Sequence, residues 1–166
     1  MPSPWTDHPK LRGRFHAEFP DDLQVIVHDG SPQISHRHAE LVWVRITGFE
    51  NDRFSGVVLN QPDQLQSVAE GSRIVFIVPE SGEHPLQVNS KYLDERSNWR
   101  LLAPCNKCGL TELFDSPSEL VASTFPSVAA EQLSLGFTFT TRCGWCGGGQ
   151  VVRLKRTRWP WSEEKL

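Results

Sequence analysis

The sequence predicts a mainly β protein: a small N-terminal β-barrel or sandwich, followed by a small C-terminal sheet module with a short helical insertion. Three observations favour this class. Twelve glycines and twelve prolines accompany few helix signals in 166 residues, a composition that favours strands and turns. Short apolar or alternating segments separated by turn residues recur between residues 23 and 78. All four cysteines lie in two copies of one pattern, C-x-x-C-G, at 105–109 and 143–147.

The N-terminal half is a series of expected strands, at 23–28, 41–47, 53–59 and 73–78. The segment 41–47 shows the clearest alternation, with Val42, Val44 and Ile46 on one face. The turn residues at 50–52 pair it with 53–59 as a hairpin. The segment 73–78 is nearly all apolar, so we expect it to be buried on both faces. A short helix that ends near Asn98 is expected between residues 88 and 99.

In the C-terminal half, strand-like segments lead into and out of each cysteine pair. Between the pairs, Ser116 and Pro117 are followed by Glu119, which is a helix-start pattern. This pattern predicts the helical insertion at 116–133. We therefore expect a β-rich domain at 12–98, a cysteine-containing domain at 99–158, and loose termini at 1–11 and 159–166.

The two cysteine pairs have the chemistry of a metal site. Two thiolates three positions apart on a tight turn can face one ion, and the following glycine lets the backbone turn beneath the sulfurs. Cys105, Cys108, Cys143 and Cys146 would thus supply the four soft ligands of one tetrahedral zinc ion. Four protein ligands leave no open coordination position for a water molecule, so we expect the zinc to be structural.

Two other uses of paired cysteines are weighed against zinc. A redox C-x-x-C pair usually begins a helix, whereas glycine and strand-like residues follow both pairs here. Disulfides need an oxidising compartment, and residues 1–8 have neither the basic start nor the apolar run of a signal peptide. No apolar run reaches membrane-spanning length. The expected location is therefore the cytoplasm, with no membrane partner.

The doubled C-x-x-C-G, with a strand before and after each copy, resembles the zinc ribbon family over residues 99–156. The spacer of 34 residues is long for the simplest ribbons, which fits the helical insertion. The resemblance implies a metal-stapled β-sheet module. It does not imply one activity, because zinc ribbons serve in nucleic-acid machines, in enzymes and as scaffolds.

A second resemblance covers residues 39–99. The segments E-L-V-W-V-R-I-T from Glu40, F-S-G-V-V-L-N-Q-P from Phe54 and E-G-S-R-I-V-F from Glu70 resemble a group of small uncharacterised bacterial domains. Some members of that group are of the immunity or regulatory type. The resemblance implies a small β-rich part and brings no catalytic residues.

Two further sets of residues suggest competing functions. His28, His36 and His38 could line an active site, although a polar surface loop is the favoured interpretation of 31–38. The segment 142–158 carries five basic residues and no acidic one, with Trp145 inside it and two tryptophans just beyond, a pattern that can bind a phosphate backbone. Those basic residues are Arg142, Arg153, Lys155, Arg156 and Arg158. The favoured interpretation of this segment is a solvated outer strand whose tryptophans pack onto the sheet.

Charge bears on the choice between these functions. The formal net charge is −3, from 17 basic and 20 acidic side chains, which argues against a general polyanion binder. The sequence therefore predicts first a non-catalytic zinc protein that binds or regulates another protein. A nucleic-acid-binding zinc ribbon is the alternative, and an enzyme built on the three histidines comes third.

Overall fold

The structure is a computed structural model that describes residues 4–29, 38–80, 84–117, 120–121 and 138–154. These residues form two compact units, one up to Val88 and the other from Asn89 onward. The fold is mainly β, as predicted, and each unit is built around its own sheet.

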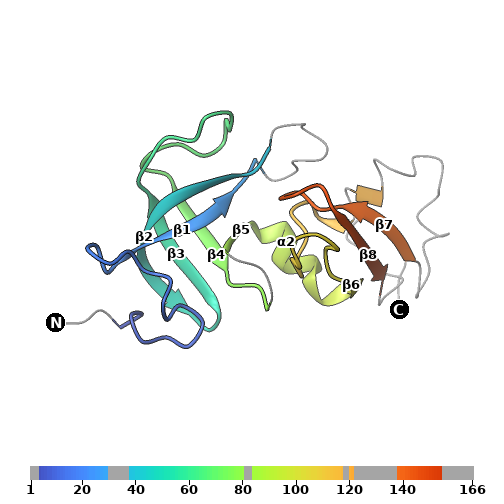
Figure 1. Ribbon diagram of the computed structural model, residues 1–166, viewed down its shortest axis with the longest axis horizontal. Helices are drawn as coiled ribbons and strands as arrows, with labels where there is room; N and C mark the ends of the chain where they lie inside the picture. Colours follow the sequence, from blue (N-terminus) through green and yellow to red (C-terminus); the bar gives the residue numbers. More distant parts are fainter. Residues whose placement is uncertain (1–3, 30–37, 81–83, 118–119, 122–137, 155–166) are drawn as a thin grey trace. The chain divides into compact units, whose positions relative to one another are not determined.

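The first unit is a closed five-stranded barrel (Figure 1). Its strands are β1 (Asp22–Val27), β2 (Glu40–Glu50), β3 (Arg53–Val58), β4 (Arg73–Ile77) and β5 (Leu86–Val88). Consecutive strands pair antiparallel, and β5 closes the barrel by lying parallel to β1, with Ile26 opposite Leu86. Closure through β5 reduces the open edge that a flat sheet would leave at β1.

The barrel interior is filled by the alternating residues of each strand. Val42, Val44 and Ile46 are at most 2% exposed, which confirms the inward face predicted for this strand. Gly56 lies opposite Ile46 on β3, where a Cβ atom would come within 2.8 Å of the Arg45 carbonyl oxygen. Only glycine allows the two strands to approach this closely.

One expectation about this unit differs from the structure. The prediction that 73–78 is buried on both faces is wrong, because Arg73 is exposed and Val75 is 39% exposed. A barrel wall packs only its inner face, so alternate residues of β4 meet solvent. The described part of the N-terminal segment also packs on the barrel. Leu11 is fully buried in the barrel core, and the Trp5 indole N–H donates to Asp21 at 2.9 Å.

The connection between β3 and β4 has no regular structure and is held by two carboxylates. Glu40 accepts hydrogen bonds from three consecutive backbone N–H groups at residues 63–65, at 2.6 to 3.3 Å. Asp29 accepts from the backbone N–H and the hydroxyl of Ser67. Ionised carboxylates are strong acceptors, so the loop is tied to the ends of β1 and β2.

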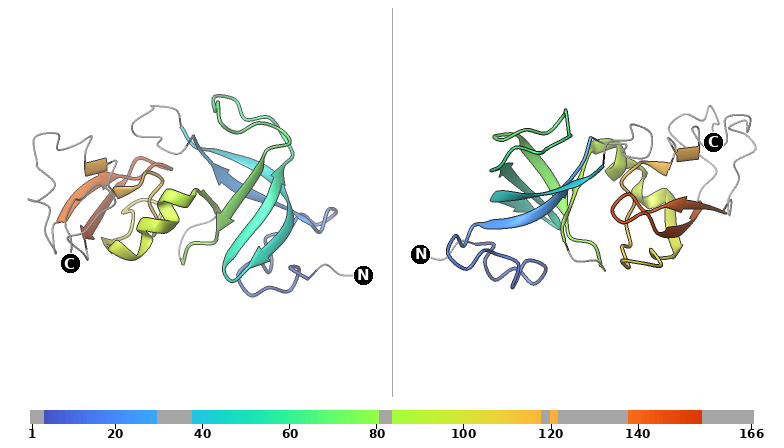
Figure 2. Two further views of the ribbon diagram at one scale, coloured as in Figure 1. Left: turned by 180° about the vertical axis from the view of Figure 1, so that it is seen from behind. Right: turned by 45° about the horizontal axis from the view of Figure 1, so that its top comes forward.

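The second unit contains α2 (Ser90–Glu95), the 3-10 helix η1 (Arg96–Asn98), and β6 (Trp99–Ala103), β7 (Thr138–Arg142) and β8 (Gly149–Leu154). The Asn89 side chain caps α2 by accepting from the Tyr92 N–H at 2.7 Å. The helical turn expected to end near Asn98 is therefore confirmed. The strands form an antiparallel sheet in the order β6-β8-β7 (Figure 2).

One face of this sheet is buried, and a partly buried ion pair supports it. Four residues, each at most 6% exposed, line the face: Trp99, Phe139, Val152 and Leu154. Glu112, itself 6% exposed, accepts two hydrogen bonds from the Arg96 guanidinium at 2.8 and 3.1 Å, and a third from the Tyr92 hydroxyl. Arg96 also lies over the Trp99 ring at 4.0 Å. Burial and hydrogen bonding to Glu112 raise the pKa of Tyr92 well above its usual value, so its hydroxyl stays a donor.

The expected helical insertion lies mostly outside the described residues. Pro117, Leu120 and Val121 are helical, and the Leu120 N–H donates to the Ser116 carbonyl at 3.0 Å. In the part of the chain that the structure describes, no helix is long and apolar enough to cross a membrane.

Candidate metal centre

Two turns of the same shape carry the four cysteines. In each turn the N–H of the final glycine donates to the carbonyl of the first cysteine at 2.9 Å, from Gly109 to Cys105 and from Gly147 to Cys143. Both glycines have left-handed backbones, with φ of 77° and 82°. This conformation favours glycine over every other residue. The glycine of the C-x-x-C-G pattern therefore has the role that the sequence predicts.

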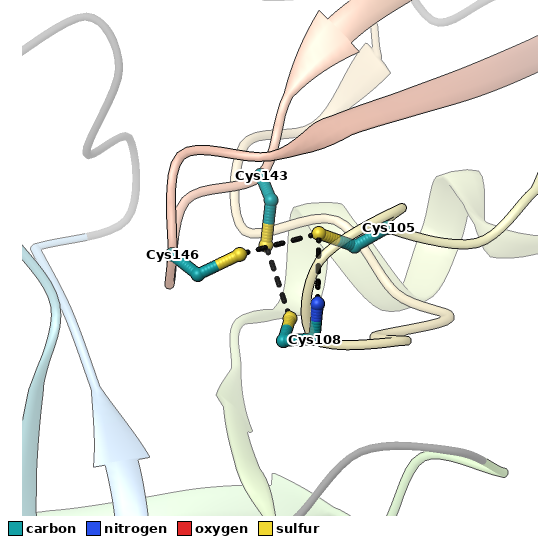
Figure 3. Close-up of side chains that lie close together, drawn as sticks. All are labelled: Cys105, Cys108, Cys143 and Cys146. Atoms are coloured by element: carbon teal, nitrogen blue, oxygen red, sulfur yellow. Dashed lines mark hydrogen bonds between the residues drawn. The ribbon is translucent and has the colours of Figure 1, made fainter.

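The turns bring the four sulfurs together (Figure 3). All four Sγ atoms lie within 4.8 Å of one another; Cys105 and Cys146 are 3.2 Å apart, and Cys108 and Cys143 are 3.7 Å apart. A tetrahedron of thiolates around zinc has sulfur–sulfur edges of about 3.8 Å, from a zinc–sulfur distance of about 2.3 Å. A disulfide needs about 2.05 Å. The spacing thus fits four ligands around one ion, and all four thiols are free.

Backbone N–H groups point at the sulfurs. Cys105 accepts from the N–H groups of Lys107 and Cys108, and Cys143 accepts from that of Trp145, each at 3.4 Å. Burial acts to raise the pKa of the Cys105 thiol, but these N–H groups and the neighbouring thiols outweigh it and lower that pKa to about 6. Burial raises the pKa of Cys108 and Cys143. Burial alone disfavours the thiolate form of these two cysteines. The positive charge of a bound metal ion would stabilise that form.

Two glycines allow the second turn to pack closely, one against a sulfur of the first turn and one against an aromatic ring. A Cβ atom at Gly148 would lie 2.6 Å from the Cys105 Sγ and 2.9 Å from the Asn106 side-chain oxygen. A Cβ atom at Gly144 would lie 2.9 Å from the ring of Phe114. The second turn can therefore close over the first only with glycine at both places.

Two polar side chains that the sequence analysis did not single out hold the turns in place. Asn106 accepts from the Gly149 N–H at 3.0 Å, which ties the first turn to the start of β8. Gln150 is 1% exposed, and its amide donates to the carbonyls of Leu110 and Glu112. A polar residue at an inward position of a strand is the signal that could have identified Gln150.

The cluster is open to solvent on one side. Cys105 and Cys143 are 4% and 2% exposed, Cys108 is half-buried and Cys146 is exposed. Among the described residues, these cysteines are the one group of histidine, cysteine and acidic side chains close enough to hold a metal ion. Thiolates alone suit zinc or an iron–sulfur cluster, and four thiolates fill a tetrahedral coordination sphere.

The histidines are placed differently. His28 is 4% exposed at the end of β1, and its Nε2 lies 2.8 Å from the Gln87 carbonyl oxygen. Burial lowers its pKa, so the ring is neutral near pH 7. His38 is exposed, and His36 lies outside the described residues.

The predicted basic residues fall on the second sheet or beyond the described chain. Arg142 and Arg153 are exposed on β7 and β8. Lys155, Arg156 and Arg158 lie outside the described residues.

Comparison with protein families, with curated proteins and with solved structures found no match to this chain.

Proposed function

We propose that the chain is a non-catalytic zinc protein whose second unit is held together by one structural zinc ion, bound by Cys105, Cys108, Cys143 and Cys146. The convergence of the four sulfurs within 4.8 Å carries this proposal. Four thiolates leave no coordination position for a water or a substrate, so the ion staples the two turns and does no chemistry. Thiols of this kind persist in a reducing compartment, which favours the cytoplasm.

The zinc is needed because the second unit is small. Its sheet has three strands, and the two turns meet chiefly through the sulfurs and the Asn106 and Gln150 contacts. A sheet of this size buries too little apolar area to fold unaided, so metal binding and folding are coupled. Elemental analysis of the purified protein tests this directly, with one zinc per chain as the expected result. Iron in place of zinc, or no metal, would refute it.

The barrel supplies the surface proposed to bind another protein. Phe19 is 53% exposed and packs against His16, which in turn contacts Trp43. Phe49 is 43% exposed and contacts His8. Exposed aromatic side chains of this kind are enriched at protein interfaces. The proposed role is that of a binding or regulatory module, of the type that includes immunity proteins.

A matched pair of variants tests the protein-binding role. A partner captured by the wild-type chain should be lost with Phe19→Ser and Phe49→Ser together. It should be retained with Val75→Ser, which removes an exposed apolar side chain of β4 that is 39% exposed. Retention of every captured protein by the double variant would refute the proposed surface.

A further inference from the structure

Two arginines lie directly opposite each other on the second sheet. Arg100 of β6 pairs with Arg153 of β8, and both side chains are exposed. Like charges directly opposite on neighbouring strands oppose their pairing. Within the described residues, no carboxylate forms an ion pair with either arginine. The pair therefore concentrates positive charge that the described chain does not neutralise.

The described residues on the rest of this sheet face include no acidic side chain. In strands, alternate residues share a face, and the exposed alternate positions continue the face on both sides of β8. Thr138 lies opposite Arg153, and Arg142 lies opposite Gly149, which is four residues before Arg153 on β8. Four residues of a strand span about 13 Å. The described residues of this outer face are Arg100, Leu102, Thr138, Thr140, Arg142, Val151 and Arg153.

The arginine side chains of this face cannot move to the opposite face of the sheet, because buried side chains fill that face. Trp99 and Val152 are fully buried there, and Phe139 is 6% exposed. The whole chain has a net charge of −3, so the positive surface is local. A polyanion should therefore be attracted to this face and not to the rest of the surface.

We propose that this outer face of the β6-β8-β7 sheet binds single-stranded nucleic acid. Guanidinium groups match phosphate oxygens with paired hydrogen bonds, and threonine hydroxyls also contact phosphates. Between the arginines lie apolar side chains, of which Leu102 is 46% exposed. Nucleic acid alternates phosphates, which match the arginines, with flat bases, which can cover Leu102. An acidic peptide offers carboxylates for the arginines but has no bases to cover Leu102. Bases are free to contact a flat sheet only when they are unpaired.

Fluorescence anisotropy with labelled 20-nucleotide oligo-dT and oligo-U, between 20 and 200 mM KCl, tests the proposal. If three arginines each contact one phosphate of a single-stranded nucleic acid, the slope of log affinity against log salt should be about −2, since each contact contributes about −0.7. Arg100→Gln with Arg153→Gln should reduce the steepness by about 1.4 and weaken binding at least tenfold at low salt. Arg73→Gln, at an exposed arginine of β4 in the barrel, is the matched control and should change neither quantity.

A second readout separates loss of binding from loss of folding. Without nucleic acid, the double variant should keep its zinc and have an unchanged or higher Tm than wild type, because the repulsion between the two arginines is gone. Three results would overturn the proposal: no binding by wild type at 20 mM KCl, equal weakening by Arg73→Gln, or equal competition by polyglutamate. Equally tight binding of a 20-base-pair duplex would also overturn it. None of these results bears on whether the cysteines hold zinc.

Discussion

Gly148→Ala separates the geometry of the metal centre from the general stability of the fold. The new Cβ atom would lie 2.6 Å from the Cys105 Sγ, whereas ordinary contacts begin at 3.4 Å. The sulfur must therefore move by about 3.4 − 2.6 = 0.8 Å if the backbone holds. Metal–ligand distances tolerate only about 0.2 Å. We expect zinc affinity to fall by about 10–100-fold, the usual result of disturbing the groups around a metal's ligands.

The neighbouring glycine is the control for this substitution. Gly147 has a φ of 82° and nothing within 4 Å of its would-be Cβ atom. Gly147→Ala should therefore cost about 1 kcal/mol of stability through its backbone conformation while leaving the sulfurs in place. Competition with a chromophoric chelator measures zinc affinity in both variants. Wild-type affinity in Gly148→Ala, or an equal loss of affinity in Gly147→Ala, would refute the proposed packing of the sulfurs.

Three other perturbations test parts of the structure away from the sulfurs. Glu112→Ala removes the carboxylate that accepts hydrogen bonds from Arg96 and from a buried tyrosine hydroxyl. The free energy of unfolding of the second unit, measured with denaturant, should fall by about 3 kcal/mol. An unchanged free energy of unfolding would show that the ion pair is unimportant. Glu40→Ala removes the acceptor of three backbone N–H groups and should speed hydrogen exchange at residues 63–65, whereas Glu50→Ala, at an exposed position of the same strand, should not. Because burial lowers the pKa of His28 in the folded barrel, this imidazole is protonated at a higher pH in the unfolded chain than in the folded one. Barrel stability should then be constant above about pH 7.5 and fall below about 6.5 by up to about 1.4 kcal/mol per pH unit; a pH dependence unchanged in His28→Gln would contradict this.

Local patterns in the sequence predicted the main elements because the same residues decide them in the fold. The alternation of Val42, Val44 and Ile46 fixed which face of β2 is inside the barrel. The hairpin turn at residues 50–52 appears where expected, with Asn51 in a left-handed conformation at φ 59°. The spacing within each C-x-x-C-G predicted the two turns, since each turn is built from neighbouring residues. The meeting of the two turns followed from chemistry, because one tetrahedral ion takes four thiolate ligands.

Features that depend on distant contacts were not predictable in this way. The apolar run at 73–78 does not reveal that Val75 faces solvent, because exposure depends on closure of the barrel by β5. The register that sets Arg100 against Arg153 depends on a bulge between Leu101 and Ala103, which no local pattern marks. The contacts of Gln150 likewise join residues some forty positions apart. The domain boundaries at 12–98 and 99–158 stay a prediction.

Chelation of the metal while both units are followed by amide NMR tests the central claim most directly. If the ion holds the second unit together, the purified chain contains one zinc. Stripping the zinc with a strong chelator should then collapse the dispersed amide signals of β6, β7 and β8 into the narrow range of an unfolded chain. The barrel signals should persist, and added zinc should restore the lost ones. A metal-free chain that keeps the signals of the second sheet would contradict the claim.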